Sequence, residues 1–272
     1  VYADPIRFDV VAHQKIVITT FFDSFLDVNT MGVSGAETYL TTGDALQTDD
    51  FDMLKGVLDD EDMLDIMAGL LEGFGMGNGI NLKFNYSFMK FIPCLVSADV
   101  LTHNSGYSVV VVGDSTVAND FPLYLGQALY EDENVTDVGV VGKGLPGNCL
   151  LYPGLGLGSY FYAESMTVRL KQDVLSQPGL KYVIVKVGVS DIIHPVCTDS
   201  VQNYPGMVQP SAKQLIEGFR RVFKACHDEG VKVIVIGITQ WKDTTRDFFG
   251  DGGTYIRTPA EFEADWQIAK DV

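Results

Sequence analysis

The sequence has few cysteine, histidine and tryptophan residues: four, four and two in a chain of 272. The cysteines show no Cys-x-x-Cys spacing, which argues against a zinc site. No apolar run approaches the roughly 18 residues that cross a membrane, so the sequence predicts no membrane span. Basic residues are also scarce, with 19 Lys and Arg against 36 Asp and Glu. The formal net charge of −17 argues against a nucleic-acid partner, whose phosphates attract basic surfaces.

Hydrophobic residues make up 46% of the sequence, which is enough for the core of one large domain or two modest ones. The most informative stretch is 108–119, which opens with four consecutive valines at 109–112. Such a short, β-branched run without polar interruption predicts a parallel strand that is buried on both faces. Gly113 breaks the run, so Ser115 should lie in a tight turn between this strand and a helix.

Two further strands should end in similar turns. The valines at 138, 140 and 141 precede one turn, and the apolar segment 182–187 precedes the other; these turns read Gly142-Lys143-Gly144-Leu145-Pro146-Gly147-Asn148 and Gly188-Val189-Ser190-Asp191. The carboxyl ends of parallel strands meet at one edge of a sheet, where ligands bind in open α/β folds. The three turns could therefore build one site beside the Ser115 hydroxyl. Cys149 and Cys197 each follow one of these turns, and we hypothesise that they approach closely enough for a disulfide.

From residue 108 onward the expected strands and helices alternate, which predicts a doubly wound parallel sheet of the α/β class. A fourth buried strand is expected over 231–238. Helices are expected over 121–130, over about 163–175, over 211–229 with Ser211 as N-cap and Gly230 just past the end, and over 259–270.

The first 105 residues follow a different pattern. Segments 7–12 and 15–22 are rich in β-branched and aromatic residues and predict two strands. Between 49 and 74, apolar residues recur at helical spacing and acidic residues cover the other positions. The acidic run lacks the register of a calcium loop, so a solvated helix face is favoured over a cation site. We predict a β-rich segment with an acidic helical insertion over 1–105, and an α/β domain over 106–272.

At the three turns the sequence resembles the SGNH (GDSL-type) hydrolases, a family of serine esterases and lipases. Gly113-Asp114-Ser115 is similar to the nucleophile block, and Gly144-Leu145-Pro146-Gly147-Asn148 is similar to the glycine block that supplies an oxyanion donor. Gly188-Val189-Ser190-Asp191 resembles the Gly-x-Asn-Asp block, with serine in place of asparagine. The resemblance covers roughly 82–272. It implies a flavodoxin-like three-layer sandwich, preceded by part of the β-rich module found in some secreted relatives.

The resemblance also implies roles for the matching residues. Ser115 would be the nucleophile, and the backbone N–H groups of Ser115 and Gly147 would stabilise the oxyanion, with Gly144 as a weaker candidate. A glycine suits this role because the missing Cβ lets the substrate approach the amide. Ser190 takes the place of the asparagine that donates the third hydrogen bond, and it does so on a shorter side chain.

Asp114 and Asp191 are expected to orient their turns through backbone hydrogen bonds rather than to act as the triad acid. The family takes its base from a late Asp-x-x-His block, and no such block occurs after the last expected helix. We therefore expect the sequence to be a piece of a longer hydrolase. His194, close to the third turn, is a substitute candidate, although a loop histidine before Pro195 is the simpler interpretation.

Two functions are open at this point. The first is an ester hydrolase that forms an acyl-enzyme on Ser115 and uses neither metal nor cofactor. Its partner would be a small-molecule ester, such as an acetylated carbohydrate or a short-chain lipid. The second is a catalytically inactive binding module that keeps the groove. A nucleotide-binding function has little support, because the first turn lacks a Gly-x-Gly-x-x-Gly pattern. The resemblance, and nothing else, implies secretion.

Overall fold

The structure is a computed structural model of the chain, and it describes residues 7, 9–11, 99–102, 106–118, 120–135, 137–154, 163–197, 206–239, 241, 255 and 257–272. The strand expected over 15–22, the acidic helix over 49–74 and most of the 1–105 module lie outside the described residues. Residues 9–11 are described and do not form the expected strand; Val11 is 72% exposed, without the cover that an apolar strand needs.

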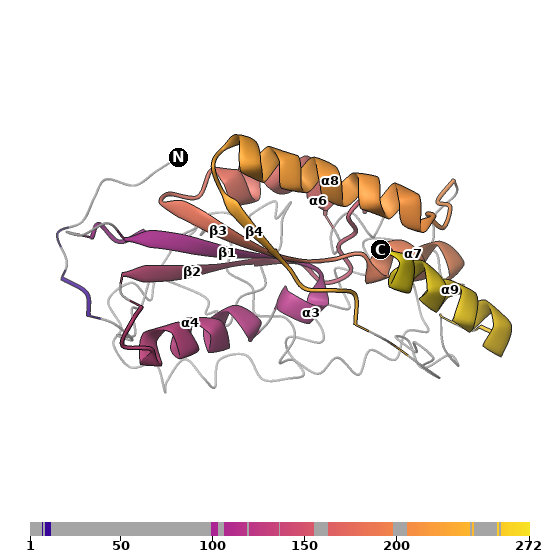
Figure 1. Ribbon diagram of the computed structural model, residues 1–272, viewed down its shortest axis with the longest axis horizontal. Helices are drawn as coiled ribbons and strands as arrows, with labels where there is room; N and C mark the ends of the chain where they lie inside the picture. The colour runs from indigo at the N-terminus through magenta and orange to yellow at the C-terminus, as the bar shows by residue number, and fades with distance from the viewer. Residues whose placement is uncertain are drawn as a thin grey trace, which may run out of the picture.

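The described part of the chain folds as an α/β domain around a four-stranded sheet (Figure 1). The strands are β1 (Tyr107–Gly113), β2 (Val138–Gly144), β3 (Leu180–Lys186) and β4 (Lys232–Val235), in the order β2-β1-β3-β4. Every pairing is parallel, and β1 is hydrogen-bonded to both β2 and β3. The predicted doubly wound parallel sheet is therefore confirmed, with its change of direction between β1 and β3.

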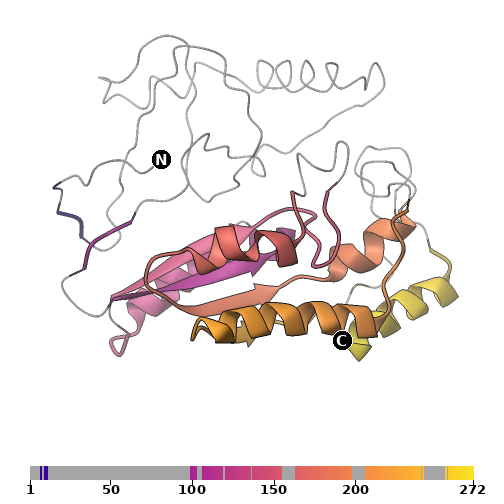
Figure 2. The ribbon, with the colours of Figure 1, turned by 90° about the horizontal axis from the view of Figure 1, so that it is seen from above.

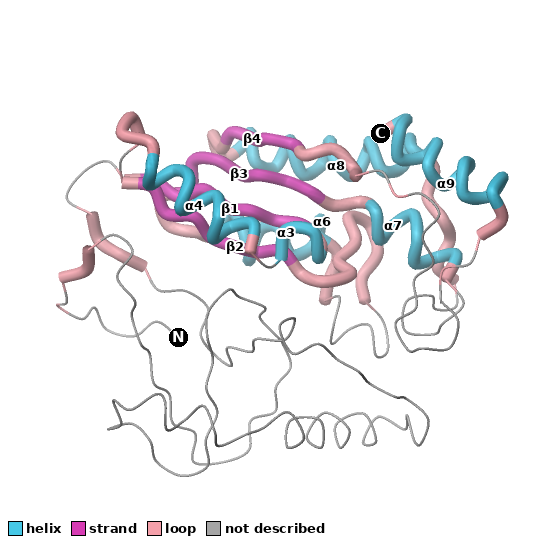
Figure 3. Tube along the Cα trace, turned by 90° about the horizontal axis from the view of Figure 1, so that it is seen from below, coloured by secondary structure: helices cyan, strands magenta, loops and turns pink. Residues whose placement is uncertain are grey.

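Helices cover both faces of the sheet, and the valine run of β1 explains why. Val109 and Val111 pack into one core with residues of α3 (Ser115–Ala118) and α4 (Phe121–Glu131). Val110 and Val112 pack into the other core with α6 (Met166–Leu170) and α8 (Ala212–Asp228). Figure 1 shows the first pair of helices below the sheet and the second pair above it, and Figure 3 shows α3 and α4 from below.

The helices begin and end close to where the sequence predicts. At the start of α8 the Ser211 hydroxyl accepts a hydrogen bond from the Gln214 N–H. In return, the side-chain oxygen of Gln214 accepts a hydrogen bond from the Ser211 N–H. Gly230 ends the helix at a φ of 73°, which glycine adopts at little cost. The helix expected over 163–175 is α6 followed by a π-helical turn over Lys171–Leu175. The helix expected over 259–270 is α9 (Pro259–Asp271).

The prediction of a fourth buried strand over 231–238 is wrong: the strand is shorter than predicted and mostly exposed. Strand β4 covers only Lys232–Val235, and Ile234 and Val235 are 49% and 48% exposed. The reason is its position: β4 lies at the edge of the described sheet, so only one side is paired, with β3. An apolar, β-branched composition cannot by itself distinguish a central strand from an edge strand.

Two short helices lie beyond the carboxyl ends of the strands, together with α9. These are α7 (Val189–Ile193) and the 3₁₀ turn over His194–Val196. Figure 2 shows α7 and α9 past the strand ends while α8 runs lengthwise along the sheet. Among the helices of the described residues, none is both long enough and apolar enough to cross a membrane.

Candidate active site

The first turn leaves the side chain of Ser115 exposed at the carboxyl end of β1. Ser115 is the first residue of α3. Gly113 allows the close approach of β3, since a Cβ atom at this position would lie 1.7 Å from the carbonyl oxygen of Lys186. Asp114 is buried, and its Oδ1 accepts hydrogen bonds from the Thr116 N–H at 2.9 Å and the Thr116 hydroxyl at 2.6 Å. Asp114 therefore orients its own turn, as the sequence predicts.

The second turn packs against the first. A Cβ atom on Gly144 would lie 2.6 Å from Cα and 2.7 Å from N of Ala118, so only glycine lets α3 approach β2 this closely. The N–H of Leu145 donates to the carbonyl of Gly113 at 3.0 Å, and the N–H of Asn148 donates to the carbonyl of Leu145 at 3.1 Å. Gly147 is buried and has a φ of 71°, in the left-handed region that favours glycine.

Arg169, on α6, holds the ends of two strands together, a role that no local pattern in the sequence indicates. Its side chain is buried and donates to the carbonyls of Lys143 at 2.9 Å and Gly113 at 3.3 Å. The same guanidinium donates twice to Oδ1 of Asn148, at 3.0 and 2.9 Å. Burial lowers the pKa of Arg169, and the ion pair with Asp173 at 3.1 Å opposes that shift. One planar cation thus fixes β1, β2 and the second turn.

Asp191 joins the third turn to the segment that follows the second. The carboxylate is fully buried and accepts hydrogen bonds from the N–H groups of Leu150 at 2.6 Å and Leu151 at 2.8 Å. Burial raises the pKa of Asp191 to about 7, although both backbone hydrogen bonds favour the charged form. Asp191 therefore anchors the segment that follows the second turn, whereas the sequence predicts hydrogen bonds within its own turn. Ser190, beside it on α7, is buried with 4% exposure.

His194 is buried, and its Nδ1 lies 3.7 Å from Sγ of Cys149. Asp191 and His194 themselves have Asp-x-x-His spacing, which the expectation of a late block leaves aside. In the structure, however, the Asp191 oxygens accept from the two backbone N–H groups named above, and the histidine ring faces the thiol. His227 is the only other described histidine, and it is exposed near the end of α8. Because α8 leads into the start of β4, His227 lies at the opposite edge of the sheet from Ser115.

The expected disulfide between Cys149 and Cys197 is not formed, and both residues are thiols. The contacts of the two sulfur atoms explain why. Sγ of Cys149 contacts His194 and the carbonyl of Gly147, whereas Sγ of Cys197 donates to the carbonyl of Ile193 at 3.3 Å. Each thiol is therefore directed toward a different group. Within the described ranges, no group of three or more His, Cys, Asp or Glu side chains could hold a metal ion.

A pocket of about 200 Å³ opens at the same edge of the sheet, beyond the ends of β1 and β3. This is the point where the strand order changes direction, the usual ligand site of an open α/β sheet. Asp114 and Thr116, the chain neighbours of Ser115, line the pocket. Ser115, Gly147 and Ser190 are not among the described residues that line it. The two chain neighbours of the exposed Ser115 thus line the cavity, and the second turn is fixed to the other side of β1.

Comparison with solved structures finds distant likenesses, one of which is to an esterase. The crystal structure of an acetyl xylan esterase, AlAXEase, matches this chain with a TM-score of 0.36 and 17% sequence identity, over 60% of this chain and 73% of that one. No protein-family model and no curated protein sequence matches the chain. A likeness at this level supports no argument about activity, so the function must be argued from the residues.

Proposed function

We propose that this protein is a serine ester hydrolase of the SGNH type, which cleaves small acyl or acetyl esters with Ser115 as its nucleophile. One observation carries the proposal: the Ser115 side chain is exposed at the carboxyl end of β1, at the switch point of a parallel sheet. The turn that contains Gly147 is fixed to the same strand end, through the N–H of Leu145 and the side chain of Arg169.

The proposed reaction has two steps. Oγ of Ser115 attacks the ester carbonyl carbon as a base removes its proton; the C–O bond breaks, and the alcohol leaves with that proton. Water then attacks the acyl-enzyme, which releases the carboxylic acid and restores the hydroxyl. The backbone N–H groups of Ser115 and Gly147 would donate to the oxyanion in both steps, and loss of one such donor typically costs a factor on the order of 10²–10³ in rate.

A second candidate function is a catalytically inactive binding module. Two observations favour it: His194 is buried against Cys149, and Ser190, in the position of the family's asparagine, is almost completely buried. A serine without a base is a weak nucleophile, so this alternative predicts a protein that binds an ester without turning it over.

Labelling with a fluorophosphonate probe separates the two functions, because the probe reacts with an activated serine. The hydrolase should be labelled and should release p-nitrophenol from p-nitrophenyl acetate, and Ser115→Ala should abolish both. Ser176→Ala is the matched control, since Ser176 is exposed near the start of β3, at the opposite edge of the sheet. Turnover that survives Ser115→Ala would refute the proposal. A folded wild type that is neither labelled nor active would favour the binding module.

A further inference from the structure

The pocket beside Ser115 has mainly apolar walls. Val187 and Val189 come from the end of β3 and the start of α7, and Ile238 and Trp241 come from the chain after β4. The polar lining residues are Asp114, Thr116, Lys186 and Thr239. Pockets for drug-sized ligands typically measure roughly 300–1,000 Å³, so a pocket of about 200 Å³ suits a smaller apolar group.

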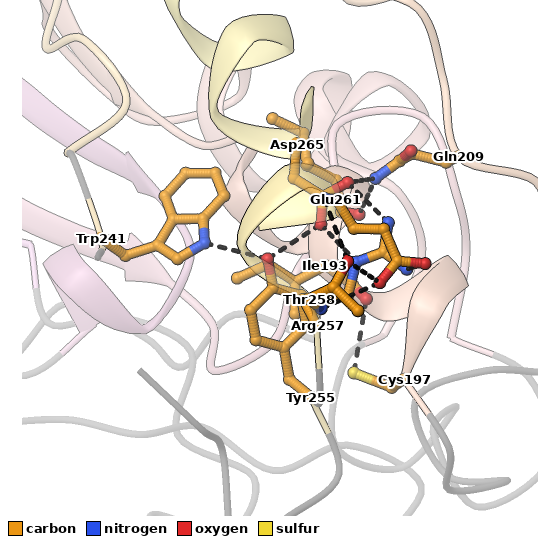
Figure 4. A network of polar contacts seen from close by, with 10 residues as sticks. Ile193, Cys197, Gln209, Trp241, Tyr255, Arg257, Thr258, Glu261 and Asp265 are labelled. Atoms are coloured by element: carbon orange, nitrogen blue, oxygen red, sulfur yellow. Dashed lines mark hydrogen bonds and ion pairs between the residues drawn. The ribbon is translucent and has the colours of Figure 1, made fainter. Parts of the chain in front are cut away.

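Trp241 is held in this wall by two ring contacts and by a hydrogen bond, which Figure 4 shows. Its indole Nε1–H donates to the hydroxyl of Tyr255 at 3.1 Å. The indole ring packs edge-on against Trp266 and Phe262 of α9, with centroid distances of 5.4 and 6.3 Å. The indole ring is therefore held in the pocket wall by Tyr255 and by two aromatic side chains of α9.

Asp265 anchors this arrangement from inside α9. Its carboxylate is fully buried and accepts hydrogen bonds from the Tyr255 hydroxyl at 2.9 Å and from Arg257 at 2.8 and 3.0 Å. Gln209 donates both to Asp265 at 2.7 Å and to the carbonyl of Ile192 in α7 at 2.9 Å. Burial raises the pKa of Tyr255 to about 12, so its hydroxyl keeps the proton that it donates. The network thus connects the indole to α7, the helix that supplies Val189 to the pocket.

We infer that this pocket binds the short alkyl part of the acyl group, and that Trp241 is the specificity-determining wall that limits its length. The inference rests on the proposed function for its substrate class. Two features of the structure support it: the pocket is lined by the two chain neighbours of the nucleophile, and Trp241 is held in the pocket wall by a hydrogen bond and two ring contacts. The carbonyl of the ester would then lie outside the pocket, on the side of Asp114 and Thr116 toward Ser115.

Calorimetric titration with straight-chain methyl ketones of increasing length tests the inference in the Ser115→Ala background. A ketone resembles the ester but is not hydrolysed, so binding is measured without turnover. Each methylene that enters the pocket should tighten binding about fourfold, until the chain reaches Trp241. Trp241→Ala should extend this gain to longer ketones. Trp266→Phe is the matched control, because Trp266 supports the indole without lining the pocket. In this variant the ketone length at which the gain in affinity stops, the cutoff, should be the same as in wild type.

Each possible result decides the inference. A cutoff that moves in Trp241→Ala and stays in Trp266→Phe supports it. The absence of binding, a cutoff unchanged by Trp241→Ala, or an equal shift in both variants overturns it. Circular dichroism shows whether each variant is folded, and Trp241→Phe, which should move the cutoff by less, replaces the alanine variant if that one unfolds. Ketone binding together with failed esterase assays would refute the hydrolase and leave the alkyl pocket standing.

Discussion

The stability of this protein should depend on pH through Asp191, and the substitution Asp191→Asn isolates that dependence. Burial raises the pKa of this carboxyl from 3.8 to about 7, so the folded protein holds a proton that the unfolded chain releases. Stability is then greatest below the unfolded pKa and is lost as the pH rises through the folded one. At about 1.36 kcal/mol per pKa unit, the loss between the ordinary pKa of 3.8 and about 7 amounts to about 4 kcal/mol.

The asparagine variant should lack this slope because an amide does not titrate. At low pH the protonated carboxyl of the wild type and the amide of the variant each offer one carbonyl oxygen to the N–H groups of Leu150 and Leu151, so their stabilities should differ by less than about 1 kcal/mol. As the pH rises toward neutrality the wild type loses stability and the variant does not. The variant should therefore become the more stable of the two near neutral pH.

Urea denaturation at several pH values between about 4 and 8 measures both free energies of unfolding. Asp132→Asn is the matched control, because Asp132 is exposed and hydrogen bonds from Asn134 lower its pKa. The stabilising effect of a lowered pKa is lost only as the pH falls below the usual aspartate range, so this variant should run parallel to wild type across the window. If the Asp191→Asn curve also runs parallel, the buried carboxyl is charged in the folded protein and the desolvation argument fails.

Three further predictions concern packing and positioning. Arg169→Lys should lower the free energy of unfolding by about 2–4 kcal/mol, because a lysine cannot donate to the oxygens of Asn148, Lys143 and Gly113 together. A loss below about 1 kcal/mol in urea denaturation would contradict this role. Gly144→Ala should cost about 1–3 kcal/mol through its clash with Ala118, whereas Gly139→Ala, with no neighbour within 4 Å, should cost far less; equal losses would exclude the clash as the cause. Tyr255→Phe should destabilise the protein by about 1–2 kcal/mol and shift the emission maximum of the tryptophans, since the indole N–H of Trp241 loses its acceptor; an unchanged spectrum would show that the ring contacts alone hold Trp241.

The architecture followed from local patterns in the sequence. A β-branched run such as Val109–Val112 has few alternatives to a buried strand, and the side chains of Ser211 and Gln214 cap α8 through bonds between residues three apart. The positions of the turns follow from those of the strands, because the carboxyl ends of parallel strands share an edge. Placement of Ser115, Gly147 and Ser190 near that edge could therefore be predicted, while their roles in catalysis stay proposals.

Only the tertiary structure decided which distant residues meet. Arg169 reaches Gly113 across 56 positions, Asp191 reaches Leu150 across 41, and Gln209 reaches Asp265 across 56. No local pattern encodes these partners, because they depend on the path of the whole chain and on which polar groups become buried together. The same reason explains the exposed edge at β4, since burial there depends on a neighbour in space rather than on the residues of the strand itself.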